Sequence, residues 1–400
     1  MASAILHIKD SYYFEVPKDL LPRHYASKAD FPTIWVQLDP QFQAWEAERL
    51  YDEFAKLNPS VGPKGQLLHE YEAWKHDHAN EGKPFDKFLE QHESYSEWFA
   101  TTAKLSGGAQ WAAAKVRAGG DEAVKVFKKD ATIKWSPETI HAYNTHLSGK
   151  ILIPQPFGEL RNFYEKESGF AISRFMIIEV AIALILWVIF AWLGRQVESG
   201  SRPRGRLWNL LEVFLVARPA IGSHDGDRFV PLLLTIFFFI LGCNLSGMLP
   251  WVGAPTGSWG VTFGLACVTF STVIVCGMQR FGFVGFFLNQ IPGMDLPLPI
   301  AIVLKPMILA IELLGLLIKH LVLSIRLLAN MVAGHIVLLA IMMMAFSIEG
   351  AASEYWGVVA PISVIGATLI SCLELFVAFL QAYIFTFLSA LFIGAAIHHH

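Results

Sequence analysis

The chain has 400 residues, of which 54% are hydrophobic and 16% charged, and its net charge is −3. Soluble domains usually carry about one quarter charged residues, so this composition excludes an ordinary soluble protein. The negative charge and the lack of a basic block disfavour nucleic-acid binding, and cysteines confined to apolar segments exclude a disulfide scaffold. Most charges lie in residues 1–170, whereas long stretches of residues 171–400 have none. We therefore expect a polar N-terminal part joined to a multi-pass membrane part.

Residues 1–155 are predicted to form a polar, mainly helical extension. Apolar residues within 42–57 recur at helical spacing. Ser136 followed by Pro137 predicts a helix start, and Gly149 predicts its end. The histidines of this part lack the spacing of a known metal site and are interpreted as solvated helix faces: His69, His76, His78 and His92. The extension contains no catalytic motif, so by itself it does not reveal a function.

The rest of the chain, residues 156–400, is predicted to be an all-α, polytopic membrane domain. Five apolar segments are long enough to span a bilayer, at about 175–194, 229–249, 260–278, 298–346 and 355–396. The last two are unusually long and are expected to form a tilted antiparallel hairpin. Lys305-Pro306 is a candidate break in the first of them. Residues 206–217 resemble an amphipathic interfacial helix, and residues 281–297 are expected to form an interfacial turn.

The distribution of charge predicts the orientation of the spans. Four arginines follow the first span: Arg195, Arg202, Arg204 and Arg206. By the positive-inside rule this loop is cytoplasmic. The loop between the last two spans contains Glu349 and Glu354 and no positive charge. These features predict an N-terminus outside and a C-terminus inside.

The predicted hairpin carries polar groups at membrane depth, namely Glu312, Lys319, Arg326, Asn330, His335, Glu374 and Gln381. Ionisable groups there are costly and by default mark an ion or proton pathway. The alternative, structural ion pairs or side chains that reach the interface, stays open for Glu312 and Lys319. Arg326 differs because it stays protonated and has no acidic neighbour in the sequence. It therefore needs a partner on another helix or subunit.

Helical geometry separates the groups on the first helix of the hairpin. Glu312, Lys319 and Arg326 recur every seven residues and share a stripe, and Asn330 lies near it. His335, nine residues after Arg326, lies nearly on the opposite face, about 13 Å closer to the outer side. The imidazole is therefore predicted to face away from the arginine stripe.

On the second helix of the hairpin, Glu374 and Gln381 are seven residues apart and share a face. Because the hairpin is antiparallel, Glu374 lies in the outer half and Gln381 about 10 Å deeper. An acid–imidazole pair of Glu374 and His335 can thus face across the hairpin. An amide and a fixed cation would lie below it.

At this point the sequence resembles a known family. Residues 324–335 (SIRLLANMVAGH) resemble the arginine-helix motif of the a subunit of F-type ATP synthases, and residues 380–385 (LQAYIF) resemble its last-helix motif. Residues 244–250 (NLSGMLP) and Glu312 also match in kind. The resemblance covers about residues 155–396. His320 departs from it, because many members have proline after a basic residue, which leaves the local bend open.

The resemblance implies a stator subunit of the proton path, packed beside a ring of c subunits that carry mid-membrane carboxylates. Arg326 would keep a passing carboxylate ionised and separate two offset half-channels. The outer half-channel would be lined by Asn244, His335, Glu374 and Gln381, with Asn330 nearby, and the inner one would include Glu312. The implied partners are the c ring, b-type peripheral stalk subunits, the remaining ATP synthase subunits and lipid, in a bacterial inner membrane rather than a mitochondrial one. No cofactor and no catalysis by the chain alone are expected, and the choice between H⁺ and Na⁺ stays open.

Two other classes of protein fit the sequence less well. A secondary ion-coupled transporter with a midplane polar site would show internal repeats and matched broken helices, but the hairpin motif occurs once. An intramembrane hydrolase would need a motif such as His-Glu-x-x-His or Gly-x-Ser-x-Gly, and the sequence contains neither.

Overall fold

A computed structural model describes residues 10–37, 39–76, 80, 83–105, 108–160, 163–164, 166–198, 226–249, 252–290, 298–347 and 353–397. The chain divides into two compact units. One is Glu15–Ala171, and the other combines Met1–Phe14 with Ile172–His400. Several predicted features lie outside the described residues: the amphipathic helix at 206–217, Arg202, Arg204, Arg206, His78 and Glu349.

The unit Glu15–Ala171, here called the N-terminal unit, consists mainly of short helices. They are α2 (Thr33–Gln37), α3 (Pro40–Leu57), α4 (Lys64–Lys75), α5 (Phe85–Gln91), α6 (Ser96–Leu105), α7 (Gly108–Ala118), α8 (Gly120–Lys129) and α9 (Pro137–Leu147), with 3₁₀ turns at Lys18–Leu20 and Lys28–Asp30. The strands are β2 (Lys150–Leu152), β3 (Gly158–Leu160) and β4 (Lys166–Gly169), while β1 (Tyr13–Glu15) lies at the division in the sequence. Strands β3 and β4 pair antiparallel, with Gly158 opposite Gly169.

Two local signals in the sequence shape this unit as predicted. Ser136 accepts a hydrogen bond from the backbone N–H of Thr139 and caps α9, and Gly149 follows the end of that helix with a φ of 80°. On α3, Phe42 and Phe54 are fully buried. An aromatic core forms around Phe54, whose ring lies 5.6 Å from that of Trp111.

A buried carboxylate joins three parts of this unit. Asp39 is 3% exposed. It accepts hydrogen bonds from the Phe42 backbone N–H at 3.2 Å, Trp135 Nε1 at 3.1 Å and the Tyr143 hydroxyl at 2.7 Å. Because a buried charge needs full hydrogen bonding, Asp39 fixes the start of α3 against α9 and the segment before it. Burial and the neighbouring Asp39 raise the pKa of Tyr143 well above its usual range.

The second unit, here called the membrane unit, contains five helices long and apolar enough to cross a membrane: α10 (Arg174–Glu198), α12 (Gly226–Gly247), α13 (Trp259–Asn289), α14 (Leu298–Ser347) and α15 (Ser353–Ile397). A 3₁₀ turn, η4 (Pro255–Gly257), precedes α13. Asp10 accepts a hydrogen bond from the Phe175 N–H in the first turn of α10. The predicted all-α, polytopic class with five spans is confirmed.

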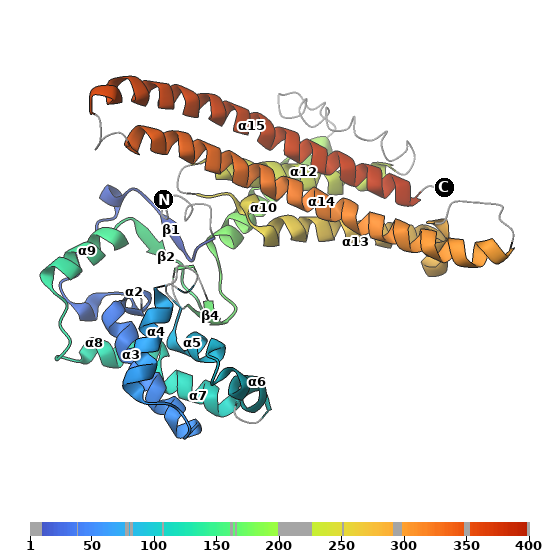
Figure 1. Ribbon diagram of the computed structural model, residues 1–400. Coiled ribbons are helices and arrows are strands. Elements are labelled where there is room, and N and C mark those ends of the chain that lie inside the picture. Colours follow the sequence, from blue (N-terminus) through green and yellow to red (C-terminus); the bar gives the residue numbers. More distant parts are fainter. Residues whose placement is uncertain are drawn as a thin grey trace. The chain divides into compact units, whose positions relative to one another are not determined.

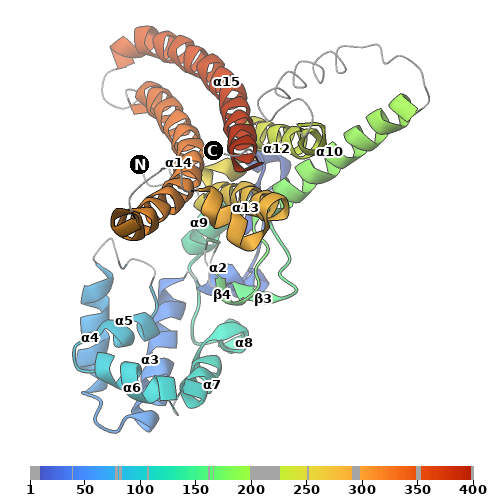
Figure 2. The ribbon, with the colours of Figure 1, turned by 90° about the vertical axis from the view of Figure 1, so that its right-hand side faces the viewer.

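The long hairpin is the main feature of the membrane unit. Helices α14 and α15 run side by side along the bundle, as both ribbon views show (Figures 1 and 2). Ile240 of α12, Leu327 of α14 and Phe385 of α15 meet in one buried cluster, so α12 packs against the hairpin. A second cluster joins Phe229 of α12, Val273 of α13 and Ile393 of α15. The apolar core therefore lies between α12, α13 and the hairpin.

Two expectations about helix breaks need correction. Helix α14 is continuous through Lys305-Pro306, where a break was a candidate. A proline has a helical φ and removes only one hydrogen bond, which membrane helices tolerate. In α13 the backbone is non-helical at Gly282, with φ 75° and ψ 169°, which falls within the segment 281–297 that was expected to form an interfacial turn. The helix then resumes and continues to Asn289, which was not expected, while residues 291–297 lie outside the described residues.

The end of α13 turns back at Gly282 because the chain there can adopt a positive φ without a Cβ clash. A Cβ added to Gly277 would lie 2.4 Å from the Phe286 ring. Because Gly277 has no side chain, it leaves space for the Phe286 ring. The segment after the kink therefore packs onto the segment before it.

A buried lysine makes the stability of the N-terminal unit depend on pH. Lys150 is 8% exposed, with its Nζ 5.7 Å from the Trp35 ring centroid and 5.1 Å from that of Phe163. Burial lowers the pKa of Lys150 from 10.5 to about 8. Between these values the unfolded chain binds more protons than the folded one, so the free energy of unfolding should rise with pH across that window.

We predict that Lys150→Met stabilises the N-terminal unit at pH 7 by on the order of 2 kcal/mol, after allowance for the lost cation–π contacts. The gain should shrink as the pH rises above 8. Thermal unfolding of the purified chain, followed by tryptophan fluorescence at several pH values, measures it. Lys134→Met, at an exposed lysine, is the matched control and should change little. A loss of stability in Lys150→Met at every pH would contradict the interpretation.

Candidate functional site

Helix α14 sorts its polar side chains onto two faces. His320 and Ser324 are buried together with Leu327 and Met331, at intervals of three or four residues. Lys319 and Arg326 lie on the exposed side. One face of the helix therefore packs into the bundle, and the other presents cations on an otherwise apolar surface.

Arg326 lies near the middle of the 50-residue helix α14. Val322 and Ile325 beside it are 43% and 41% exposed. Among the described residues, no acidic side chain lies within 4 Å of the Arg326 guanidinium, and the guanidinium makes no hydrogen bond. Because this charge is permanent, the surface around it is incomplete without a further partner.

Glu312 and Lys319 form an ion pair along the same helix. The Lys319 Nζ lies 3.5 Å from Glu312 Oε1, and the two side chains are 50% and 44% exposed. The structure thus shows the ion pair that the sequence left open as an alternative for these two residues. Arg326, seven residues further on, takes no part in it.

His335 and Glu374 meet across the hairpin. The Nδ1 of His335 lies 3.2 Å from Glu374 Oε1, and the side chains are 16% and 5% exposed. The two atoms are at ion-pair distance without the alignment of a hydrogen bond, and His335 Nε2 is buried without a hydrogen-bond partner among the described residues. Gly334 makes room for the carboxyl group, since an added Cβ would lie 3.2 Å from Glu374 Oε1.

Asn244 lies one helical turn along α15 from this pair, through its contact with Ala378. It is fully buried, donates from Nδ2 to the Ala378 carbonyl at 3.2 Å, and accepts from the Thr256 hydroxyl at 2.7 Å. Ala378 is one turn beyond Glu374. The amide therefore joins α12 and η4 to α15 beside the carboxylate, and both of its ends are occupied.

For Gln381 and Asn330, the structure gives a position but no hydrogen-bond partner of the side chain among the described residues. Gln381 is 7% exposed, seven residues along α15 from Glu374. Asn330 is half-buried on α14, one turn beyond Arg326. The structure brings together His335 with Glu374, and Glu312 with Lys319. No hydrogen bond joins Gln381 and Arg326 among the described residues.

Two buried polar residues of α14 were not predicted to belong to the bundle interior. The Ser324 hydroxyl donates to the Thr262 hydroxyl at 3.2 Å, linking α14 to α13. The His320 ring lies 5.2 Å from Phe270 and 5.0 Å from Phe392, with Nδ1 2.9 Å from the Leu316 carbonyl. Their spacing from Leu327 could have revealed this inward face. The helix passes through His320 without interruption.

These observations define a multi-pass membrane protein whose last two helices hold charged and titratable groups within the span. Comparison with known sequences then assigns the family. The sequence model described as ATP synthase A chain matches residues 175–394, and the chain belongs to this family. It is accordingly a membrane subunit of the ATP synthase, with a part in ATP synthesis and proton transport, and not a catalytic subunit by itself.

Curated relatives support the assignment. ATP synthase subunit a of Chloroherpeton thalassium is 37% identical over 292 residues, which cover 70% of this chain and 83% of that protein. Subunit a of Myxococcus xanthus is 40% identical over 230 residues, 55% of this chain and 72% of that one. ATP synthase subunit a 2 of Chlorobaculum tepidum is 38% identical over 255 residues, 61% and 69% of the two chains. The 292-residue match is longer than the chain from residue 175 onward, so it includes part of the N-terminal unit.

Proposed function

We propose that the chain is the stator subunit of the proton path in a rotary F-type ATP synthase, with Arg326 separating two offset half-channels beside a ring of c subunits. The observation that carries the proposal is the unpaired guanidinium on the exposed face of α14. A ring carboxylate at the same depth would supply the missing opposite charge. This account explains why a permanent cation is retained on an apolar surface.

The chemistry follows from the properties of the guanidinium group. A nearby positive charge favours the ionised form of a carboxylate. Arginine keeps its proton in proteins, so it cannot relay protons from one half-channel to the other. A ring carboxylate that reaches Arg326 would therefore release its proton. A protonated carboxylate could reach the other half-channel only if the ring rotates it there by the path that avoids Arg326. Proton flow and rotation are coupled in this way.

The outer half-channel is proposed to begin at His335 and Glu374. Imidazole gains and loses a proton near neutral pH, and the carboxylate 3.2 Å away can exchange that proton with it. Gln381 and Asn330 would carry the path inward toward Arg326. Asn244 would hold the Glu374 turn of α15 in place through its bond to Ala378.

The inner half-channel is proposed to include Glu312. This carboxylate is 44% exposed and lies two heptads before Arg326 on the same stripe. Its ion pair with Lys319 would hold the carboxylate in position where protons leave the ring. The proposed partners are the c ring, b-type stalk subunits and the remaining ATP synthase subunits.

The orientation rests on the distribution of charge. Arg195, Arg228, Arg280 and Lys305 lie toward one end of the bundle, whereas the opposite end holds Glu354. We place the first end in the cytoplasm of a bacterium, which agrees with the bacterial relatives.

Residues 1–155 would then form an extension on the outer side. Added protease should cleave this extension in right-side-out vesicles, and its protection there would reverse the assignment.

We predict that Arg326→Ala abolishes coupled ATP synthesis while the chain still inserts and assembles, because the ring carboxylate loses its counter-charge. ATP synthesis by inverted vesicles, with subunit content checked by immunoblotting, measures the effect. Arg195→Ala removes an exposed arginine outside the proposed path and should retain synthesis. Arg326→Lys should not restore it fully, since lysine is a compact charge that can lose its proton. Synthesis at the wild-type rate in assembled Arg326→Ala would refute the proposal.

We predict that Glu374→Gln slows proton flux on the order of 100-fold, the usual contribution of a positioned proton-transfer group. The exchange His335→Glu with Glu374→His should recover part of the flux, because it restores one acid and one imidazole. Passive proton uptake by vesicles stripped of the catalytic sector reports this directly. Thr368→Val, which removes an exposed hydroxyl of the same helix, is the control. Normal flux in Glu374→Gln, or failure through loss of assembly alone, would favour a static ion pair.

A further inference from the structure

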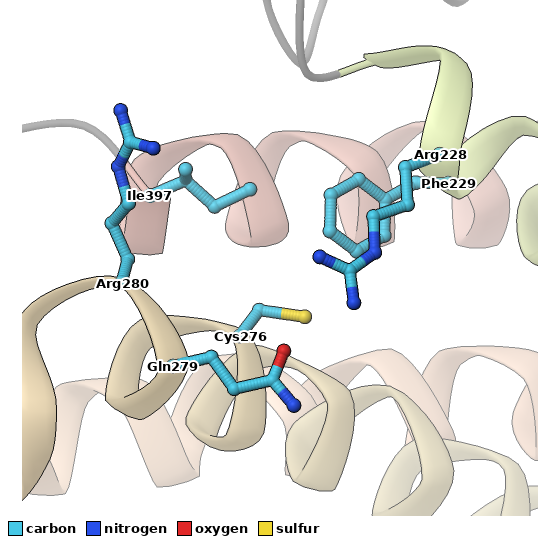
Figure 3. Close-up of a pocket in the computed structure, with 6 residues that line it drawn as sticks. All are labelled: Arg228, Phe229, Cys276, Gln279, Arg280 and Ile397. Atoms are coloured by element: carbon cyan, nitrogen blue, oxygen red, sulfur yellow. The ribbon is translucent and has the colours of Figure 1, made fainter.

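A small cavity with cationic walls lies at one end of the membrane unit, away from the hairpin site. It has a volume of about 170 Å³ and is lined by Arg228, Phe229, Cys276, Gln279, Arg280 and Ile397. Arg228 and Phe229 begin α12, the next three belong to α13, and Ile397 ends α15. Figure 3 shows Arg228 reaching from α12 toward Gln279 and Cys276, while Arg280 rises from α13 beside Ile397.

The described lining of the cavity is positively charged. Among the described residues, no acidic side chain pairs with either guanidinium, and both arginines are exposed at the cavity mouth. Each helix end contributes roughly half an elementary charge: positive at the start of α12 and negative at the end of α15. The two full positive charges of the arginines exceed these partial ones. The described lining therefore favours an anion, and the Gln279 amide can add a hydrogen bond to it.

The size of the cavity indicates what kind of anion fits. Pockets for drug-sized ligands span about 300–1,000 Å³, so this one admits a compact charged group and leaves the rest of a larger molecule outside. Arginine forks match phosphate oxygens in geometry. A phosphate group is therefore the preferred occupant.

An apolar groove continues from the cavity. It runs along one face of α13, past Cys267, Val268, Thr272 and Val275, and its volume is about 470 Å³. Cys276 lines both the groove and the cationic cavity. Val268 and Val275 are 50% and 46% exposed. The groove lies within a membrane-spanning helix, so its natural neighbour is an acyl chain.

We propose that this end of the membrane unit is a binding site for an anionic phospholipid, with the phosphodiester between Arg228 and Arg280 and one acyl chain along the α13 groove. Basic pockets between membrane helices are a recurrent mode of recognition for anionic headgroups. The kink at Gly282, two residues after Arg280, ends the straight part of α13 at the level where a headgroup would lie. The site would join α12, α13 and α15 at their shared end.

Titration of the purified full chain with phosphatidylglycerol, followed by native mass spectrometry, tests the proposal. The double variant Arg228→Gln with Arg280→Gln should weaken binding at least tenfold, which corresponds to about 1.4 kcal/mol. Arg228→Lys with Arg280→Lys should weaken binding less than the glutamine pair, because it keeps both charges but not the guanidinium forks. Arg195→Gln removes an exposed arginine at the end of α10 and should change binding less than twofold. Equal losses in Arg195→Gln and the double variant would overturn the site.

A second variant keeps the test valid if the arginine changes impair folding. Cys276→Phe fills the junction of cavity and groove with both arginines in place and should also abolish binding. Cys372→Phe, at an exposed cysteine of α15 outside the cavity and the groove, is the matched control and should leave binding unchanged. Unchanged phosphatidylglycerol binding in Cys276→Phe would contradict the proposal.

Two further ligands show whether the site binds a lipid headgroup or a free phosphate ion. Phosphatidylcholine, which has the phosphate and acyl chains without net charge, should bind at least tenfold more weakly than phosphatidylglycerol. Inorganic phosphate at millimolar concentration should not displace the lipid, because it lacks the acyl contact. Displacement by inorganic phosphate would show a free-anion site and refute the lipid assignment, as would equal binding of the two lipids.

Discussion

The cost of leaving a guanidinium against hydrocarbon is the constraint on which this membrane unit depends. Arg326 lies in the middle of α14 with apolar neighbours, and the described part of the chain offers it no acidic partner. Arginine keeps its proton in proteins, so deprotonation does not remove this energetic cost. The charge must therefore be met from outside the chain, by a group at the same depth. The proposed rotor, which carries carboxylates, would satisfy that need once for each subunit that passes.

The rest of the hairpin directs its buried polar groups toward partners within the bundle. On the inward side, Ser324 bonds Thr262 and Asn244 bonds Ala378, so these buried polar groups are satisfied within the bundle. His335 and Glu374 lie between the helices rather than on the exposed stripe. A proton path that starts at this pair must therefore pass through the protein before it reaches Arg326. Fixed hydrogen bonds around a titratable pair suit a stator, which must not move while its rotor does.

Sequence reasoning predicted the parts that depend on periodicity and charge. The five spans follow from apolar length, and the meeting of His335 with Glu374 follows from helical spacing in an antiparallel hairpin. The sequence did not predict the structure where a single residue is compatible with two backbone conformations. Pro306 could break a helix or be tolerated within one. A turn was expected at residues 281–297, but not that helix would resume after Gly282 and continue to Asn289. The two hydrogen bonds of Asn244 also could not be predicted, because they join three elements that are distant in the sequence.

The most direct test of the account is disulfide cross-linking between the exposed stripe of α14 and the ring. Val322→Cys, one turn before Arg326, would be combined with a cysteine beside the mid-membrane carboxylate of the c subunit, after the four native cysteines are changed to alanine. The account predicts efficient cross-linking under mild oxidation in the assembled complex. Val268→Cys on α13, which is similarly exposed, should give none. Cross-linking from Val268 but not from Val322 would place the rotor on another face and contradict the central role of Arg326.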